Sequence, residues 1–187
     1  MTRSSAEPTV VRVARPSDAA GVSALARLAF PRLHEDLLPP DVVATIVAAT
    51  LSPAAIRSYI DRCSGQPDWH FLVAESDGRL VGYLHHDGAE GEPELHRLYV
   101  DPQRKRGGIG SALMQALHEL LRPGASYFLF VHAANADAIS FYERHGLIQE
   151  ARLEMTYPGL ELAEDTPPSL VLRACRAGSV FSAQLSP

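Results

Sequence analysis

A glycine-rich loop that opens a predicted helix is the segment best suited to hold an anion. It reads Lys105-Arg106-Gly107-Gly108-Ile109-Gly110-Ser111 and follows a strand-like run over 94–100. Glycine permits positive φ and lets a ligand approach the backbone closely. The first N–H groups of a helix lack intrahelical partners, and the helix dipole adds positive potential there. We therefore predict a phosphate or pyrophosphate site, with Arg104, Lys105 and Arg106 adding mobile positive charge.

Two well-known nucleotide motifs fit this loop poorly. A P-loop needs Lys-Ser or Lys-Thr after its last glycine, and neither follows here. The dinucleotide fingerprint needs a third glycine, but Gly108-Ile109-Gly110 is followed by Ser111, Ala112 and Leu113. A nucleotide-binding protein using this loop and a plain glycine-rich turn with solvated basic residues both remain as alternatives.

A second segment places aromatic side chains on one face of a predicted helix. Between residues 135 and 147, Ala138, Phe141, Tyr142 and His145 lie at positions i, i+3, i+4 and i+7. Such a face is typical of packing, but a tyrosine hydroxyl can also donate a proton in general acid catalysis. Both roles remain open for Tyr142 on the pattern alone.

Together the two segments resemble motifs A and B of the GNAT acetyltransferases. Motif A reads Gln/Arg-x-x-Gly-x-Gly/Ala, and alignment on Gly108-Ile109-Gly110 places Lys105 at its first position, which is a departure. Motif B reads Asn-x-x-Ala-x-x-Phe-Tyr-x-x-x-Gly-Phe and matches 135–147, with Leu147 in place of the final Phe. The resemblance covers roughly 10–174, and the two motifs occur in the family's order.

The resemblance implies a single α/β domain whose mixed, mostly antiparallel sheet is splayed between strands 4 and 5 and flanked by helices. Acetyl-CoA would lie in the opening as a cosubstrate. The backbone of Leu98 and Val100 would contact the pantetheine and acetyl carbonyl, the N–H groups from Arg106 to Ser111 would take the pyrophosphate, and Asn135 would contact the pantetheine arm. The implied cofactor-binding residues are Leu98, Tyr99, Val100, Lys105, Arg106, Gly107, Gly108, Ile109, Gly110, Ser111, Asn135 and Tyr142.

The implied activity is direct attack of a primary amine on acetyl-CoA within a ternary complex. Tyr142 would protonate the leaving sulfur, as similar tyrosines in the family do. Glu94, at the start of the fourth strand, is the first candidate for the base, and His96 shares its sheet face. Other candidates are His85, His86 and His132, or water alone. The alternative function is a non-catalytic acyl-CoA-binding or sensing module on the same fold.

The elements that must position these residues follow from hydrophobic periodicity and turn signals. We predict helices from Ser17 or Asp18 to about Phe30, over 41–50 and 53–63, from Ile109 to Leu120 or Leu121, and from Asn135 or Asp137 to about His145. Asp77-Gly78 predicts a hairpin between strands at 70–74 and 80–86. The remaining strands are predicted at 10–13, 94–100, 127–131, 148–157 and 169–174, with a polar loop at 158–168. The apolar run 127–131 predicts a central strand covered on both faces.

Bulk composition is that of one globular domain. The chain has 187 residues and a net charge of −5, which disfavours a nucleic-acid binder and is compatible with a cationic amine acceptor. No run approaches the roughly 18 apolar residues of a membrane span, and no signal peptide is evident. Cys63 and Cys175 show no metal-ligand spacing, so we expect no metal site and a cytoplasmic protein. We predict a flexible N-terminus at 1–9, a domain at 10–175 and a tail at 176–187; the resemblance is compatible with a homodimer.

Overall fold

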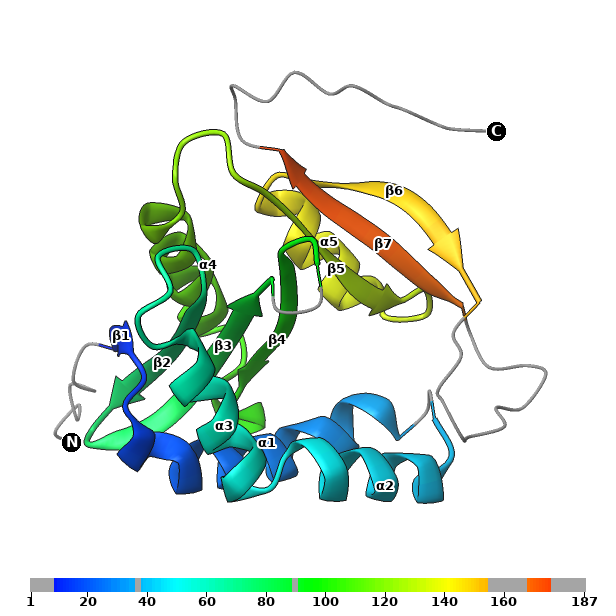
Figure 1. The fold of residues 1–187 in the computed structure, drawn as a ribbon. Helices are drawn as coiled ribbons and strands as arrows, with labels where there is room; N and C mark the ends of the chain where they lie inside the picture. Colours follow the sequence, from blue (N-terminus) through cyan, green and yellow to red (C-terminus); the bar gives the residue numbers. More distant parts are fainter. Residues whose placement is uncertain (1–8, 36–37, 89–90, 155–167, 176–187) are drawn as a thin grey trace, which may run out of the picture.

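The computed structural model describes residues 9–35, 38–88, 91–154 and 168–175, and Figure 1 shows the arrangement of their elements. The strands are β1 (Val10–Val13), β2 (His70–Ser76), β3 (Arg79–Asp87), β4 (Glu94–Val100), β5 (Ser126–His132), β6 (Leu147–Leu153) and β7 (Ser169–Cys175). The helices are α1 (Ala19–His34), α2 (Pro40–Thr50), α3 (Pro53–Cys63), α4 (Ile109–Leu120) and α5 (Ala136–Arg144). Short 3-10 turns at Pro16–Asp18 and Pro102–Arg104 precede α1 and α4.

The described strands form one sheet in the order β1-β2-β3-β4-β5-β7-β6. Every neighbouring pair is antiparallel except β4 and β5, which are parallel. The predicted mixed, mostly antiparallel sheet is therefore confirmed. In Figure 1, β5, β7 and β6 turn away from the other four strands, so the sheet is splayed at the β4–β5 pair.

The β2–β3 hairpin forms where the Asp-Gly signal predicted it. Asp77 and Gly78 both have positive φ, at 52° and 67°, as a two-residue hairpin turn of the type I′ class requires. At the opposite end of the hairpin, the β3–β4 register changes: His85 pairs with Arg97, whereas His86 pairs with Leu95. His96 is therefore an extra residue in β4, which is a β-bulge.

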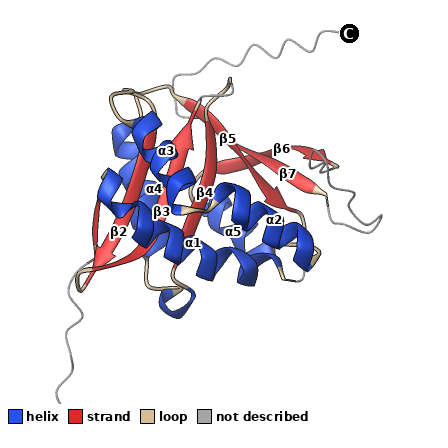
Figure 2. Ribbon diagram, turned by 60° about the horizontal axis from the view of Figure 1, so that its bottom comes forward, coloured by secondary structure: helices blue, strands red, loops and turns tan. Residues whose placement is uncertain are grey.

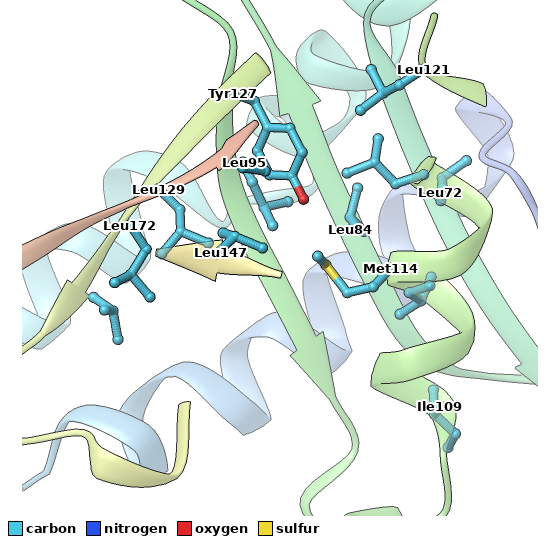
Figure 3. Close-up of a cluster of buried hydrophobic side chains, with 14 of the residues drawn as sticks. Leu72, Leu84, Leu95, Ile109, Met114, Leu121, Tyr127, Leu129, Leu147 and Leu172 are labelled. Carbon is cyan, nitrogen blue, oxygen red and sulfur yellow. The ribbon is translucent and has the colours of Figure 1, made fainter. Parts of the chain in front are cut away.

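Helices cover both faces of the sheet, as Figure 2 shows. On one face, α1, α2 and α3 pack against alternate residues of β2 and β3, among them Phe71, Val73 and Tyr83. On the other face, α4 packs through Leu113 and Met114 against a set that includes Leu84, Leu95, Tyr127, Leu129 and Leu172 (Figure 3). Strands β2 and β3 are therefore buried on both faces, between the two layers of helices.

Two local expectations were wrong, and the start of α1 carries no side-chain cap. Strand β5 is not covered on both faces, since Phe130 is 43% exposed while Leu129 and Val131 face the core. Helix α1 continues past Pro31 to His34. Asp18 does not cap α1 with its side chain. Its carboxylate instead accepts hydrogen bonds from the Arg15 backbone N–H and the Arg12 guanidinium, both at 2.7 Å.

Several expectations fall outside the described residues. These are residues 1–8 of the predicted N-terminus, the end of the strand predicted at 148–157, residues 158–167 of the polar loop, and the tail at 176–187. Within the described ranges, no single helix is long and apolar enough to cross a membrane. Helices α2 and α3 meet that length and composition only together, with a 53° bend between them.

Candidate functional site

The splay between β4 and β5 is the central feature of the site. The two strands share one register pair, Glu94 with Phe128, beside which the Phe128 N–H donates to the Pro93 carbonyl at 3.1 Å. Beyond that pair the strands separate toward their carboxyl ends (Figure 1). In open α/β sheets, ligands bind outside the carboxyl ends of parallel strands. The open end of this pair is therefore the place to look for a ligand.

The backbone at the open end of β4 faces the splay. The Asp101 N–H donates to the Val81 carbonyl at 2.9 Å, so Asp101 is directed toward β3. Alternate residues of an antiparallel strand direct their N–H and C=O groups to opposite sides. Leu98 and Val100 therefore direct these groups away from β3, toward the space between β4 and β5. The sequence expectation for their backbone is compatible with this geometry.

The glycine-rich loop has the conformation of an anion cradle. Arg106 and Gly108 have positive φ, at 65° and 78°, and Gly108 is the residue that caps α4. The first helical hydrogen bond of α4 runs from the Ala112 N–H to the Gly108 carbonyl, at 2.9 Å. The N–H groups of Ile109, Gly110 and Ser111 precede that bond and face out of the helix end. Such an end suits a phosphate group.

The three basic residues that precede Gly107 do not share one role. Arg104 donates hydrogen bonds to Ser76 Oγ at 2.9 Å and to Asp77 Oδ2 at 3.2 Å, so it ties the loop to the β2–β3 turn. Lys105 and Arg106 are exposed. The expectation of mobile positive charge therefore fits Lys105 and Arg106 but not Arg104.

Helix α5 lies against the first turn of α4. A Cβ atom on Gly110 would lie 3.3 Å from the Phe141 ring, and His145 Nε2 lies 3.1 Å from Ser111 Oγ. Asn135 caps α5, and its Oδ1 accepts a hydrogen bond from the Ala138 N–H at 3.1 Å. Because Oδ1 is used in capping, a ligand contact of Asn135 would come from its amide nitrogen or backbone.

Tyr142 is half-buried and packs against the core beside Phe141, with ring centroids 5.2 Å apart. Burial, with smaller effects from Tyr99 and Tyr127, raises the pKa of its hydroxyl well above the ordinary value. The hydroxyl therefore carries its proton at neutral pH, as a general acid must. The packing role and the proton-donor role of Tyr142 are thus compatible.

Glu94 and His96 lie in contact, and His96 also contacts Asp87, a residue that the sequence analysis missed. His96 Nδ1 lies 3.2 Å from Glu94 Oε1, and His96 Nε2 lies 3.0 Å from Asp87 Oδ1. Burial alone would lower the pKa of His96, but the two carboxylates together raise it. The two carboxylates thus favour the charged form of the ring, which argues against His96 as the proton acceptor. The polar run His85-His86-Asp87 at the end of a buried strand was the available signal for Asp87.

The other candidate histidines lie in the interior. His85 and His86 are each 1% exposed, and burial lowers the pKa of both to about 4. His132, at the end of β5, is buried in edge contact with His34 of α1, with ring centroids 5.9 Å apart. Of these, His132 lies at the carboxyl end of β5, while His85 and His86 belong to the packed end of β3.

A cation is a poor fit to the one described cluster with metal-ligating atoms. Cys63, His85 and Asp87 place such atoms within 4.8 Å of one another. However, Asp87 Oδ2 already lies 2.8 Å from both the Arg62 guanidinium and His85 Nε2. Burial raises the pKa of the Cys63 thiol to about 12, so the thiol stays protonated. The cluster is better explained as a hydrogen-bonded network.

Comparisons with known proteins agree with this geometry. The model of the GNAT acetyltransferase family matches residues 31–147. An uncharacterized N-acetyltransferase of Mycobacterium tuberculosis is 32% identical over 136 residues, which are 70% of this chain and 83% of that protein. The mycothiol acetyltransferase of Saccharopolyspora erythraea is 34% identical over 125 residues, 58% of this chain, and the match spans only 41% of that longer relative.

Solved structures share the fold at low sequence identity. The PaiA N-acetyltransferase of Thermoplasma acidophilum, in complex with coenzyme A, has a TM-score of 0.73 at 20% identity, covering 90% of this chain and 99% of that one. The structure of YncA from Salmonella typhimurium, with its cofactor acetyl-CoA, has a TM-score of 0.68 at 15% identity, covering 92% of this chain and 96% of that one. Taken with the matched family model, these findings place the sequence motifs on the expected fold. The chain belongs to the GNAT family of acetyltransferases.

Proposed function

We propose that the protein transfers the acetyl group of acetyl-CoA to a primary amine, by direct attack of the amine within a ternary complex. The observation that carries the proposal is the joint position of two features. An anion cradle precedes α4, and the backbone of Leu98 and Val100 faces the space where β4 and β5 separate. A donor with a pyrophosphate and an extended arm matches both features, and two structural relatives hold coenzyme A or acetyl-CoA.

The proposed donor-binding residues follow from that geometry. The pyrophosphate would accept hydrogen bonds from the N–H groups between Arg106 and Ser111, with Lys105 and Arg106 as nearby cations. The pantetheine arm would pair with the Leu98 and Val100 backbone much as a further strand would. Asn135, which caps α5, Tyr142 of α5 and Tyr99 of β4 would complete the contacts.

The chain's own groups supply two of the effects that acetyl transfer needs. The N–H of Val100 would donate a hydrogen bond to the carbonyl oxygen as it gains negative charge. Tyr142 would give its proton to the departing sulfur and regain a proton as the new amide forms. Holding amine and thioester together in one site would contribute a further part of the rate.

Glu94 is the proposed acceptor of the amine's proton. It is half-buried at the joined end of β4 and β5, and His96 holds its carboxylate. Because the carboxylates of Glu94 and Asp87 raise the pKa of His96, its role would be that of a neighbour to the base rather than a second base. Glu94 begins β4 and Val100 ends it, about 20 Å apart in an extended strand, so the proton would reach Glu94 through a chain of water molecules.

Titration calorimetry with acetyl-CoA is the first test of the proposal. Micromolar binding to the wild type, followed by release of free thiol with a panel of amines, would support it. The panel should include simple amines, amino acids, peptides with a free N-terminus and the acceptor of the mycothiol acetyltransferases. Binding without thiol release from any amine would favour the acyl-CoA-sensing alternative, and absence of binding by the folded protein would refute both.

A further inference from the structure

We propose that Asp87 is a positioning residue, which acts through His96 to hold Glu94 in place for proton transfer. This inference rests on the proposed function and assigns a role to a buried group that the reaction itself does not touch. The three side chains come from the facing ends of β3 and β4, with Asp87 paired to Glu94 in the strand register.

The first step of the argument is the imidazole of His96. Its two ring nitrogens lie against two different carboxylates, at 3.0 Å from Asp87 Oδ1 and 3.2 Å from Glu94 Oε1. An ionised carboxylate only accepts hydrogen bonds. Both nitrogens can donate at the same time only when the ring is an imidazolium. The observed geometry thus belongs to the charged ring, which bridges the two acids.

The second step is the burial of Asp87. Its side chain is 1% exposed, and a buried carboxylate is costly unless it is paired and hydrogen-bonded. Arg62 of α3 donates to Oδ2 at 2.8 Å, and His85 Nε2 lies at the same distance from that oxygen. These contacts fix the carboxylate, so Oδ1 presents a fixed acceptor to His96.

The third step is the state of His85. Its Nδ1 lies 3.1 Å from the Arg97 guanidinium, which can only donate, so Nδ1 accepts. The ring therefore carries its proton on Nε2 and donates it to Asp87. The Tyr59 ring stacks on the His85 ring, with centroids 5.0 Å apart. The Arg97 guanidinium lies over the same Tyr59 ring, 4.7 Å from its centroid. His85 is thus held as a neutral donor, and His96 is the member of the network that changes charge.

The fourth step is the β-bulge. The extra residue in β4 places His96 and Arg97 on the same side of the sheet, because both contact side chains of β3 there. In a regular strand these neighbours would point to opposite faces. The bulge thus brings one cation to Asp87 and another to His85 while leaving Glu94 beside His96.

The pH behaviour follows from the charges that face each group. Asp87 is faced by Arg62 and Cys63 of α3, His85 of β3 and His96 of β4. His96 is faced by Glu94, Asp87 and His85. Removal of the Asp87 charge takes away one of the two carboxylates that favour the imidazolium. The bridged arrangement should then break at lower pH than in the wild type.

The test is the Asp87→Asn variant of the full chain, with Asp61→Asn as a matched control. Asp61 lies on α3 and is half exposed, paired only with Arg57 among the described residues. The expected result is a kcat lowered by about tenfold to a hundredfold, with little change in acetyl-CoA affinity. The alkaline limb of the kcat profile should move to lower pH, whereas the control should behave as the wild type.

A second variant and a spectroscopic measurement keep the proposal open to refutation if Asp87→Asn does not fold. His96→Gln should lower kcat with similar retention of acetyl-CoA binding. NMR titration of His96 in the wild type should give a pKa above the ordinary histidine value. A His96 that titrates at or below that value, or variants with normal kcat and an unmoved pH profile, would overturn the proposal.

The same measurements separate this proposal from the function beneath it. If the wild type is active and the variants lose catalysis, the result supports the roles of Asp87 and His96 and leaves the proposed function intact. If the wild type neither binds acetyl-CoA nor releases thiol, the proposed function is refuted, and the catalytic role of Asp87 is refuted with it. In that case the NMR titration still shows whether Asp87 and Glu94 hold the imidazolium.

Discussion

Gly110 lies directly against Phe141, since a Cβ atom on Gly110 would be 3.3 Å from the aromatic ring. These residues belong to the two motifs that the sequence presents about thirty positions apart. Their contact docks α5 on the first turn of α4, so the anion cradle and Tyr142 become parts of one structure. Gly110 therefore leaves the space that the Phe141 ring occupies, whereas Gly108 allows the positive φ at the start of α4.

Gly108→Glu should abolish acetyl-CoA binding, because a strained side chain with a negative charge would stand at the proposed pyrophosphate site. Gly124→Glu is the matched control. Gly124 has nearly the same φ, 83° against 78°, and the same open space where a Cβ atom would lie, but it follows α4. Both variants should lose about 1–2 kcal/mol of stability from backbone strain. Calorimetry should show loss of binding in the first variant alone.

Local signals predicted much of this fold because they act over short distances. The Asp77-Gly78 turn, the Ser52 cap of α3 and the glycines before α4 each determine their own segment. The Ser52 hydroxyl accepts a hydrogen bond from the Ala55 N–H, as its position before Pro53 predicts. These features need no knowledge of distant neighbours.

The features that sequence reasoning missed depend on tertiary contacts. The exposed face of β5 arises because the splay moves Phe130 away from the helices that cover β2 and β3. Asp87 meets its side-chain partners only when α3, β3 and β4 come together around it. In the sequence Arg104 is one of three consecutive basic residues, but in the fold it donates hydrogen bonds to Ser76 and Asp77 at the β2–β3 turn.

Tyr142→Phe should lower kcat by about a hundredfold and leave the acetyl-CoA dissociation constant almost unchanged. The reason is that only the hydroxyl is removed, while the ring packing on the core is kept. Tyr127→Phe is a suitable control, since it removes a hydroxyl that lies 2.8 Å from His118 on the α4 side of β5. Steady-state kinetics with the best acceptor amine would decide the matter. An unchanged kcat in Tyr142→Phe would remove this residue from the mechanism.

Glu94→Gln should lower kcat/KM for the amine most strongly below the pKa of the amine. Below that pKa the amine is protonated and must lose a proton before it can attack. At higher pH the amine is already neutral, so the kcat/KM values of variant and wild type should become equal. Glu119→Gln, on the exposed side of α4, provides the control. Rate profiles that keep a constant ratio across pH would contradict the role of Glu94 as base.

Gly82→Ala should destabilise the domain, because α4 lies too close to β3 for a methyl group. The added Cβ would be 2.9 Å from Ile109, 3.1 Å from Leu113 and 3.2 Å from the Tyr99 carbonyl oxygen. Overpacking of this kind costs about 1–3 kcal/mol. Urea unfolding should show the loss, with Gly21→Ala as comparison. At Gly21 the new methyl meets the mobile end of Leu80, and alanine favours the helix.

His86→Leu should reduce the sensitivity of the fold to acid. His86 is buried with no hydrogen-bond partner for either ring nitrogen among the described residues, and burial lowers its pKa from 6.5 to about 4. His86 is therefore protonated at pH values below about 6.5 in the unfolded chain, but only below about pH 4 in the folded chain. Stability is lost as pH falls through this window, at about 1.4 kcal/mol per pH unit for one such group.

Between pH 7 and pH 5 this single histidine should thus lower the free energy of unfolding by about 2 kcal/mol. His85 adds a loss of the same sign, whereas His96, whose pKa is raised, loses its stabilising effect as pH rises instead. Urea unfolding at the two pH values should show a smaller difference in His86→Leu than in the wild type. An equal difference in both proteins would mean that His86 does not remain neutral in the folded state, and that the packed end of β3 admits a proton more readily than its burial implies.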